Sequence, residues 1–238
     1  MNRVILLTAT VHPSVIGKAT GSSEERRNEY IDAIKFYLAS TSYPIIIVDN
    51  SDYDFSNDVR DDFSRFEPLH FVGDDIGRGK GWGECQILKY ALSHSESLKN
   101  ADQIIKITGR LKIRNITQIL NGCNDAKSVY ADSDLKFSYP HSYFFCCPIS
   151  FLKNELCSRH DMMNDKGGVH FEHVFGVAIK FWRESHSFHE FKYPLNIEGH
   201  PGNSKRTYQG PTLRRKFFTF LKYICNEILN IQKTIKIR

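Results

Sequence analysis

The sequence contains no long apolar run. Its first hydrophobic stretch, residues 4–7, is far shorter than the roughly 20 apolar residues of a membrane-spanning helix. It is also too short for the hydrophobic core of a secretory signal peptide, so we expect neither a transmembrane segment nor export. A strong excess of one charge is missing as well: the net charge of the 238 residues is only +5, which argues against broad binding to nucleic acid.

Cysteine motifs are also missing. None of the six cysteines stands in C-x-x-C spacing, so the usual signature of a structural zinc site is absent from the sequence. Two histidine pairs, His170 with His173 and His186 with His189, have i, i+3 spacing, but no further ligand follows at a suitable distance. We attribute these pairs to chance and expect reduced thiols in a cytoplasmic protein.

What the sequence does contain is an alternation of strand and helix patterns. A buried strand is expected at 3–10, a helix at 22–38 with Ser22 and Glu25 as its capping box, and a second strand at 44–51. This β-α-β order predicts an α/β fold with a mainly parallel central sheet that is flanked by helices. Further strands are expected at 69–73, 103–110, 128–131 and 143–147, and further helices at 58–66, 116–120 and 171–182.

Residues 77–84, Gly-Arg-Gly-Lys-Gly-Trp-Gly-Glu, place glycines between charged and aromatic residues. An apolar helical pattern follows at once, so the stretch predicts a glycine-rich loop that opens a helix. Backbone N–H groups in such a loop can approach an anion closely, and the helix N-terminus adds partial positive charge. Lys80 and Arg78 would add full charges. The alternative is a basic surface turn without a ligand.

Polar residues follow several of the predicted strands. Ligands of open α/β sheets bind at the carboxyl ends of the strands. The groups expected there are Thr8, Thr10, Asp49, Ser51, Lys80, Gly81, Glu84, Thr108 and Arg110. A carboxylate suits a base or ribose, whereas cations and glycine backbone suit a diphosphate, so the set predicts a nucleotide site.

The order of these motifs resembles that of bacterial GT-A-fold glycosyltransferases, family-2-like enzymes that assemble surface polysaccharides such as O-antigen, capsule and lipooligosaccharide. The resemblance extends over roughly residues 3–210. It is carried by 6–10 (Leu-Leu-Thr-Ala-Thr), 47–51 (Ile-Val-Asp-Asn-Ser), 79–84 (Gly-Lys-Gly-Trp-Gly-Glu), 106–110 (Lys-Ile-Thr-Gly-Arg) and 171–173 (Phe-Glu-His). It implies a GT-A-like, Rossmann-like fold and a nucleotide-sugar donor, with UDP as the nucleotide.

The resemblance also implies roles for individual residues. Asp49 and Ser51 would contact the nucleoside, and Lys80 and Arg110 would neutralise the phosphates. Glu84 would hold hydroxyl groups of the donor sugar or orient Lys80.

One motif of this family is missing. Such enzymes usually carry Asp-x-Asp at the end of the fourth strand to hold a divalent metal, whereas this chain has residues 106–110 there. The departure predicts metal-independent phosphate handling, with Lys80, Arg110 or both as the counter-charge. A salt bridge that closes a loop is the alternative for Arg110. Asp132 and Asp134 form a later Asp-x-Asp, which we interpret as a solvated turn, with a Mg²⁺ or Mn²⁺ site as the alternative.

The resemblance places the catalytic base at the start of a helix after the acceptor-side strands, and Glu172 fits this position. As the base of an inverting transfer it would take the proton of the acceptor hydroxyl. The alternative is an acid that only stabilises the helix N-terminus. Asp161 and Asp165 are weaker substitutes, and a retaining reaction stays open.

Residues 198–208 combine glycines, small polar residues and cations. They predict a flexible loop that closes over the donor diphosphate, with His200 and Ser204 among the binding residues. An exposed linker to the C-terminal stretch is the alternative.

The C-terminal stretch, 211–238, alternates basic and apolar residues. Neither an internal repeat nor a low-complexity linker precedes it, so we expect one domain over 1–210 followed by this helix. Its charges are too many for a membrane span, and Glu227 is its only acid. The pattern predicts an interfacial amphipathic helix that is attracted to anionic lipid. The alternative is a helix packed on the domain or on a second subunit.

These features predict an inverting glycosyltransferase that needs no metal cofactor. It would move a hexose from a UDP-sugar to a polyprenyl-diphosphate-linked or other lipid-linked saccharide, at the inner face of the cytoplasmic membrane. Two alternatives stay open. A sugar nucleotidyltransferase usually carries its basic glycine loop after the first strand, whereas here the loop follows the third. The other alternative is a membrane-associated binding module without enzymatic activity.

Overall fold

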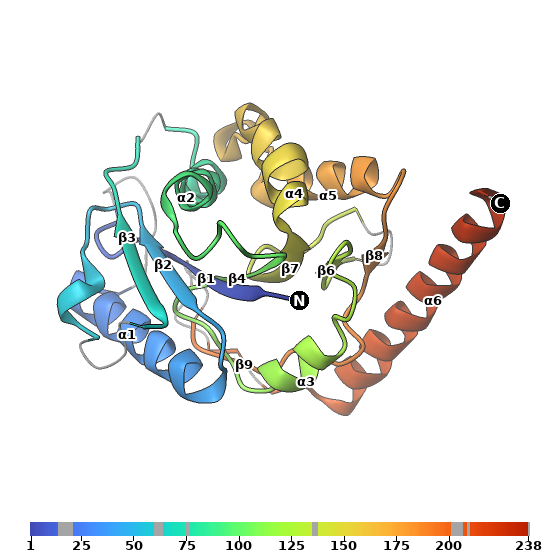
Figure 1. The fold of residues 1–238 in the computed structure, drawn as a ribbon, viewed down its shortest axis with the longest axis horizontal. Coiled ribbons are helices and arrows are strands. Elements are labelled where there is room, and N and C mark those ends of the chain that lie inside the picture. The colour runs from blue at the N-terminus through green and yellow to red at the C-terminus, as the bar shows by residue number, and fades with distance from the viewer. Residues whose placement is uncertain are drawn as a thin grey trace.

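In the computed structural model, which describes residues 1–13, 21–59, 64–74, 77–134, 138–200, 207–208 and 210–237, the chain is organised around a seven-stranded sheet (Figure 1). For 233–237 only the backbone is described. The strand order is β3-β2-β1-β4-β7-β6-β8. The strands are β1 (Arg3–Ala9), β2 (Ile45–Asp49), β3 (Phe66–His70), β4 (Gln103–Thr108), β6 (Val129–Ala131), β7 (Phe144–Pro148) and β8 (Phe188–His189). A separate two-stranded sheet pairs β5 (Lys112–Ile113) with β9 (Ile197–Glu198).

The strand directions divide the sheet into two halves. β3, β2, β1 and β4 are parallel neighbours, whereas β7 runs antiparallel to both β4 and β6. β8 then pairs in parallel with β6. The predicted α/β fold with a mainly parallel central sheet is therefore confirmed.

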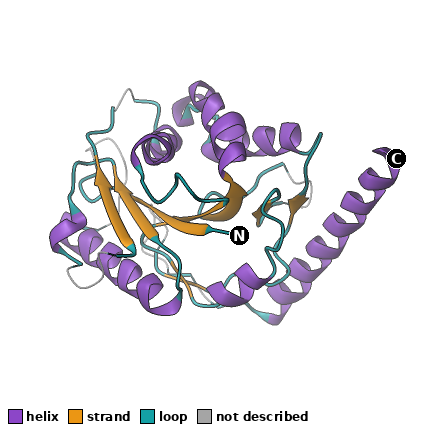
Figure 2. Cartoon of the chain, viewed as in Figure 1, coloured by secondary structure: helices purple, strands orange, loops and turns teal. Residues whose placement is uncertain are grey.

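Helices cover both faces of this sheet (Figure 2). The α-helices are α1 (Ser23–Ser40), α2 (Lys80–His94), α3 (Ile116–Asn121), α4 (Ile149–Phe151), α5 (Phe171–Trp182) and α6 (Leu213–Ile237). Three 3-10 segments, Phe55–Asn57, Cys157–Met162 and Asp165–Gly167, and one π-helical segment, Leu152–Leu156, complete the described helices. Within the described part of the chain, no helix combines the length and apolar character needed to cross a membrane.

The apolar runs of the sequence form two cores, one on each face of the sheet. Side chains of a strand alternate between the faces, so Ile5 and Leu7 of β1 pack with α1 and α3, whereas Val4 and Leu6 pack with α2 and α5. Because both faces are covered, the central strands carry continuous apolar sequence instead of an alternating one.

Several local predictions are confirmed at the residue level. Ser22 and Glu25 form the expected capping box at the start of α1. The predicted helix 171–182 coincides with α5, and Val174 and Phe175 are buried on its inner face. Phe181, however, is 50% exposed, because Trp182 and not Phe181 faces the core.

The region around β3 differs from the prediction. The helix expected at 58–66 is wrong at its end, since Phe66 begins β3, while 60–63 lie outside the described residues. The strand expected at 69–73 lies earlier, at Phe66–His70. β3 is an edge strand, so Pro68 is tolerated within it and its pattern is less apolar than that of a central strand.

The arrangement of β1 and β4 creates a switch point in the sheet. From β1 the chain continues to β2 and β3 on one side, and it then crosses to β4 on the other. Ligands of open α/β sheets bind at the carboxyl ends of the strands beside such a point.

Candidate functional site

The carboxyl ends of β1, β2 and β4 lie at one edge of the sheet. In their register Thr8 is level with Thr108, and Ala9 is level with Asp49. The sequence predicted that these polar residues gather, and the register places them together. Thr8 is 7% exposed, and its carbonyl oxygen accepts a hydrogen bond of 2.9 Å from the backbone N–H of Gly109.

Asp49 orders the loops that follow β1 and β2. It is fully buried, and its carboxylate accepts hydrogen bonds from the N–H of Val11 at 2.8 Å and from the N–H and Oγ of Ser51 at 2.7 and 2.6 Å. The predicted contact of Asp49 with a nucleoside would therefore be indirect. Ser51 and Thr10 remain half-buried, and Thr10 Oγ1 donates to Asn50 Oδ1 at 2.6 Å.

The glycine-rich stretch lies at the N-terminus of α2. The helix begins at Lys80, one residue after Gly79 (φ +100°), so the later glycines belong to its first turn and not to a loop. A Cβ at Gly79 would lie 2.6 Å from Asp165 Cβ, and a Cβ at Gly81 would lie 2.9 Å from the backbone N of Phe171. These two glycines therefore allow the N-terminus of α2 to meet the N-terminus of α5.

Asp165 lies where the two helix N-termini meet. Its Oδ2 accepts a hydrogen bond of 3.1 Å from the N–H of Gly81, and its Oδ1 is 3.2 Å from Nδ1 of His170, the N-cap of α5. A carboxylate in this place shows that the converging helix N-termini accommodate negative charge. From sequence alone Asp165 is a weaker candidate base than Glu172, because nothing in its local pattern indicates that α2 packs against it.

Lys80 is exposed and forms no hydrogen bond or ion pair with another described residue, although the carboxylate of Asp165 lies close enough to act on its charge. The pKa of Lys80 is lowered, first by partial desolvation and then by the positive charge of Arg26; the negative charge of Asp165 opposes this shift, and Arg110 adds a smaller lowering effect. Arg26 is buried, and its Nε donates to the carbonyl oxygen of Thr10 at 2.9 Å. Sequence reasoning did not identify Arg26, since it looks like an ordinary charged residue of α1.

The other two predicted cations are engaged elsewhere. Arg110 is 4% exposed and its Nη1 lies 2.6 Å from Glu29 Oε2, which is the loop-closing salt bridge named as the alternative. Arg78 lies over the Trp82 ring at 4.5 Å and donates to the carbonyl oxygen of Asp161 at 3.0 Å. Arg110 is therefore paired with a carboxylate, whereas Arg78 is held by an aromatic ring and a backbone carbonyl, which do not neutralise its charge.

Lys106 of β4 and Glu84 of α2 form a buried ion pair between the sheet and this helix. Lys106 lies in β4 with its side chain 0% exposed, and its Nζ also donates to the carbonyl oxygen of Ser142 at 2.6 Å. Burial raises the pKa of Glu84, and the adjacent Lys106 charge acts in the opposite direction. The partner of Glu84 is thus Lys106, and the predicted orientation of Lys80 by Glu84 is not what the structure contains.

Glu172 stands in the first turn of α5, as predicted. Its Oε1 accepts a hydrogen bond of 2.6 Å from Ser142 Oγ, so Ser142 links Glu172 to the Lys106–Glu84 pair. The other oxygen, Oε2, has no hydrogen-bond partner among the described residues, and the side chain is half-buried. The geometry thus leaves one carboxylate oxygen of Glu172 able to accept a proton.

A run of aromatic rings leads away from Glu172 and was not anticipated from the sequence. We call it the aromatic strip; its members are His173, Tyr139, His141, Tyr143 and Tyr208. Ring centroids are separated by 5.1 Å for Tyr139–His173, 6.5 Å for Tyr139–His141, 5.1 Å for His141–Tyr143 and 6.1 Å for Tyr143–Tyr208. The alternation of Tyr139, His141 and Tyr143 along the chain is the sequence pattern that could have indicated the aromatic strip.

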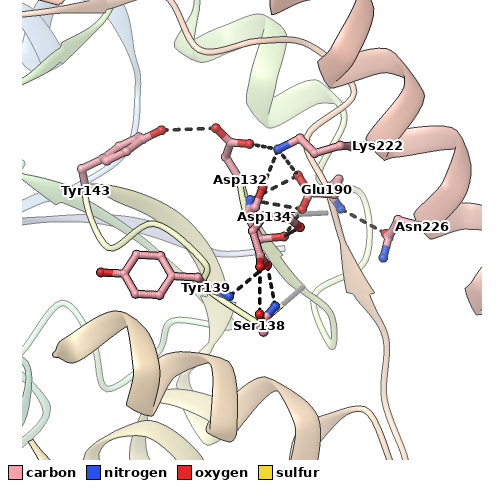
Figure 3. Close-up of polar contacts among 9 residues, drawn as sticks. Asp132, Asp134, Ser138, Tyr139, Tyr143, Glu190, Lys222 and Asn226 are labelled. Atoms are coloured by element: carbon pink, nitrogen blue, oxygen red, sulfur yellow. Dashed lines mark hydrogen bonds and ion pairs between the residues drawn. The ribbon is translucent and has the colours of Figure 1, made fainter. Parts of the chain in front are cut away.

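Asp132 and Asp134 do not converge on a common point (Figure 3). Asp134 accepts hydrogen bonds from the N–H and Oγ of Ser138 at 2.6 and 2.8 Å, as expected for a turn. Asp132 accepts from the Tyr143 hydroxyl at 3.2 Å and forms an ion pair with Lys222 of α6. Within the described ranges, no group of three or more His, Cys, Asp or Glu residues is arranged to hold a metal ion. The residues present therefore do not fit the alternative Mg²⁺ or Mn²⁺ site.

The Asp132–Lys222 pair belongs to a wider polar network that includes Glu190. Glu190 is 2% exposed and accepts a hydrogen bond of 3.1 Å from the N–H of Ser133. Burial raises the pKa of Glu190 to about 7, with Lys222 opposing the shift. Burial alone would lower the pKa of Lys222, but Asp132 and Glu190 outweigh it, so the pKa is raised.

The loop at residues 198–208, which was predicted to close over the donor diphosphate, is described only in part. Ser204 falls within 201–206, outside the described residues. His200 is described, and its Nδ1 is a buried atom without a hydrogen-bond partner in the described part of the chain. Glu198 belongs to β9 and pairs with Lys112 at 2.7 Å, so the start of this segment is held by the small sheet.

A hollow of about 330 Å³ lies at the opposite edge of the sheet. It is lined by residues 1–4 together with Tyr43, Pro44, Ser97, Asn100 and Ala101. Arg3, its one basic side chain, is engaged with Gln103 Oε1 at 2.9 Å. The amino ends of parallel strands are not where α/β sheets bind ligands, and we assign no function to this hollow.

Comparison with known proteins shows no family for this chain. Neither a protein-family model nor a curated protein matches it. Among solved structures, it is similar to a Desulfovibrio desulfuricans protein described provisionally as a nucleotide-diphospho-sugar transferase, with 12% identity, a TM-score of 0.46 and coverage of 80% of each chain. It is also similar to a 4-diphosphocytidyl-2C-methyl-D-erythritol synthase, with 9% identity, a TM-score of 0.45 and coverage of 93% of this chain and 99% of that one. These scores are too low to support a function for this chain.

Proposed function

We propose that this chain is a glycosyltransferase that moves a hexose from a nucleotide sugar, with UDP as the nucleotide, to a saccharide acceptor. The observation that carries the proposal is the meeting of the α2 and α5 N-termini at the carboxyl ends of β1 and β4. Lys80 stands on one side of this meeting point and Glu172 on the other. The cation and the helix N-terminus can stabilise a departing diphosphate, and the carboxylate can act as a general base.

The donor would bind along the edge formed by β1, β2 and β4. The half-buried Thr10 and Ser51 would contact the nucleoside, while the first turn of α2 and Lys80 would neutralise the diphosphate. Arg26, which is close enough to lower the pKa of Lys80, adds positive potential to the same region. A cationic region of this kind stabilises the charge that develops on the leaving nucleotide.

The transfer step would use the free oxygen of Glu172. Glu172 Oε2 takes the proton of an acceptor hydroxyl while that oxygen attacks the anomeric carbon. The bond from this carbon to the phosphate oxygen breaks, and its electron pair leaves with the nucleotide diphosphate, so the configuration inverts. Ser142 holds the opposite oxygen, Oε1, at 2.6 Å and thereby fixes the orientation of the base.

The acceptor would bind over the aromatic strip. Tyr139 lies near Glu172, and the strip continues through Tyr143 to Tyr208, toward the start of α6. Apolar ring faces suit the C–H faces of sugars. We propose that the acceptor is a lipid-linked saccharide of bacterial surface-polysaccharide synthesis, met at the inner face of the cytoplasmic membrane.

A donor screen tests the proposed reaction. The full chain is incubated with UDP-, GDP- and CMP-sugars and a synthetic lipid-diphosphate saccharide, and products are identified by mass spectrometry. A glycosyltransferase yields an acceptor heavier by one sugar and a free nucleotide. Formation of a nucleotide sugar and pyrophosphate from a nucleoside triphosphate and a sugar phosphate would instead identify the nucleotidyltransferase alternative.

Lys80→Ala should weaken nucleotide binding by about 10- to 100-fold, because a charge-assisted contact is worth about 1.5–3 kcal/mol. Isothermal titration with UDP measures the effect. The matched control is Lys89→Ala, which removes an exposed lysine from the same helix. An unchanged affinity of the Lys80→Ala variant for UDP would show that the N-terminus of α2 serves packing and not nucleotide binding.

Transfer should proceed in EDTA at the rate seen with added Mn²⁺. Asp132 and Asp134 are each engaged in separate contacts, so we propose that Lys80 and the α2 N-terminus replace a metal as counter-charge. Initial rates in the two buffers decide the point. Strict dependence on Mn²⁺ would contradict this part of the proposal.

A further inference from the structure

The helix α6 packs against the domain through a polar face. We define its docked face as Thr219, Lys222, Asn226 and Asn230. Thr219 is 8% and Asn226 0% exposed, and Asn226 Oδ1 accepts a hydrogen bond of 3.1 Å from the N–H of Glu190. Lys222 pairs with Asp132 and donates to the carbonyl oxygen of Ser133 at 2.7 Å (Figure 3). Further along, Asn230 Nδ2 donates to the carbonyl oxygen of Phe188 at 2.9 Å.

Most of the exposed apolar residues of α6 lie on the opposite side of the helix. We define its outer face by residues that recur on one side of a helix of 3.6 residues per turn. Their exposed fractions are Leu213 84%, Phe217 60%, Phe220 49%, Leu221 40%, Ile224 38%, Ile228 49% and Ile231 59%. A surface helix of a globular protein normally buries its apolar stripe against the core. The polar network on the docked face holds α6 in the reverse orientation, so the apolar face is left for a partner.

The charges around the outer face select the kind of partner. Arg214 and Lys216 are both exposed at its N-terminal end. The one acid of α6, Glu227, is engaged with His189 Nδ1 of β8 at 2.6 Å, so its carboxylate is turned toward the domain. Two copies of such a face would bring like charges together, whereas an anionic lipid surface offers headgroups to the cations and acyl chains to the apolar side chains.

We propose that α6 is an interfacial membrane helix whose outer face lies in the headgroup region of an anionic bilayer. The docked face ties this helix to Asp132, whose other partner is Tyr143 of the aromatic strip. The lipid surface would therefore lie on the side of α6 that faces away from Tyr143, the strip member joined to Lys222 through Asp132 (Figure 3). The inference deepens the proposed function, since it rests on that function for its link to a lipid-linked acceptor, but lipid binding itself needs no substrate.

Vesicle co-sedimentation of the full chain tests the inference without nucleotide or acceptor. Phosphatidylcholine vesicles with phosphatidylglycerol should bind the chain, and pure phosphatidylcholine vesicles should bind it at least about tenfold more weakly. Phe217→Ser combined with Ile228→Ser should reduce binding to the anionic vesicles by at least about tenfold. Arg214→Gln combined with Lys216→Gln should reduce it by about tenfold and remove most of its salt dependence.

The matched control is Phe181→Ser, which removes an exposed aromatic side chain from α5. It should bind vesicles like the unmodified chain, and circular dichroism should show all variants folded, because the replaced side chains are exposed. Absence of binding to anionic vesicles would overturn the inference. So would a stable dimer in light scattering that dissociates on Phe217→Ser, since a second copy would then cover the outer face. Vesicle binding together with a failed donor screen would leave the inference standing and remove only the proposed reaction.

Discussion

Replacing Glu172 with glutamine should lower kcat for sugar transfer by about a thousandfold while leaving UDP affinity within about twofold, as expected when a general base is lost. Glutamine keeps the size of the side chain and can still accept the hydrogen bond from Ser142 Oγ. It cannot take a proton from the acceptor hydroxyl. Because the donor would lie along β1, β2 and the α2 N-terminus, its binding should be spared.

Two further variants serve as a control and as a test of the alternative base. Glu184→Gln makes the same chemical change at an exposed position just beyond α5, and its kcat should be unchanged. Asp165→Asn tests the other carboxylate at the meeting point of α2 and α5. A Glu172→Gln variant with near-normal kcat, together with an inactive Asp165→Asn variant, would transfer the role of base to Asp165.

Glu84→Gln should lower the free energy of unfolding by about 2–4 kcal/mol, because removing one partner of a buried ion pair leaves an uncompensated charge. The side chain of Lys106 is 0% exposed, while that of Glu84 is 20% exposed, which reduces the expected cost from that of a fully buried pair. Urea unfolding followed by circular dichroism measures the difference.

Two controls separate burial from the simple loss of an ion pair. Glu96→Gln removes one partner of the exposed Glu96–Lys99 pair and should change the stability by less than about 0.5 kcal/mol. Adding Lys106→Met to Glu84→Gln removes both charges, and part of the lost stability should return. A Glu84→Gln variant as stable as the unmodified chain would show that Lys106 does not depend on Glu84.

Much of the fold could be predicted from local pattern. Continuous apolar runs identified β1, β2 and β4, and the capping box and apolar spacing identified α1 and α5. The position of β3 was harder to predict, because an edge strand that contains a proline lacks the continuous apolar sequence of a buried strand. The face of α6 that contacts the domain could not be assigned, since its docking depends on polar residues that look like surface residues in sequence.

Residue positions that follow from strand order could be predicted, whereas contacts that depend on tertiary packing could not. Thr8, Asp49 and Thr108 could be placed because each lies at the carboxyl end of a strand. The partners of Arg110 and Glu84 could not be predicted, because Glu29 and Lys106 are distant from them in sequence. These residues become neighbours only when α1 and α2 pack on the sheet. The same is true of the aromatic strip, which joins three separate segments.

Nucleotide binding at the α2 N-terminus is the claim on which the proposed reaction depends. Isothermal titration of the full chain with UDP, GDP and CMP tests it most directly. We predict saturable binding of at least one nucleotide, UDP first, with one site per chain and an affinity that falls in Lys80→Ala but not in Lys89→Ala. Failure of all three nucleotides to bind, or binding that is indifferent to Lys80, would contradict it.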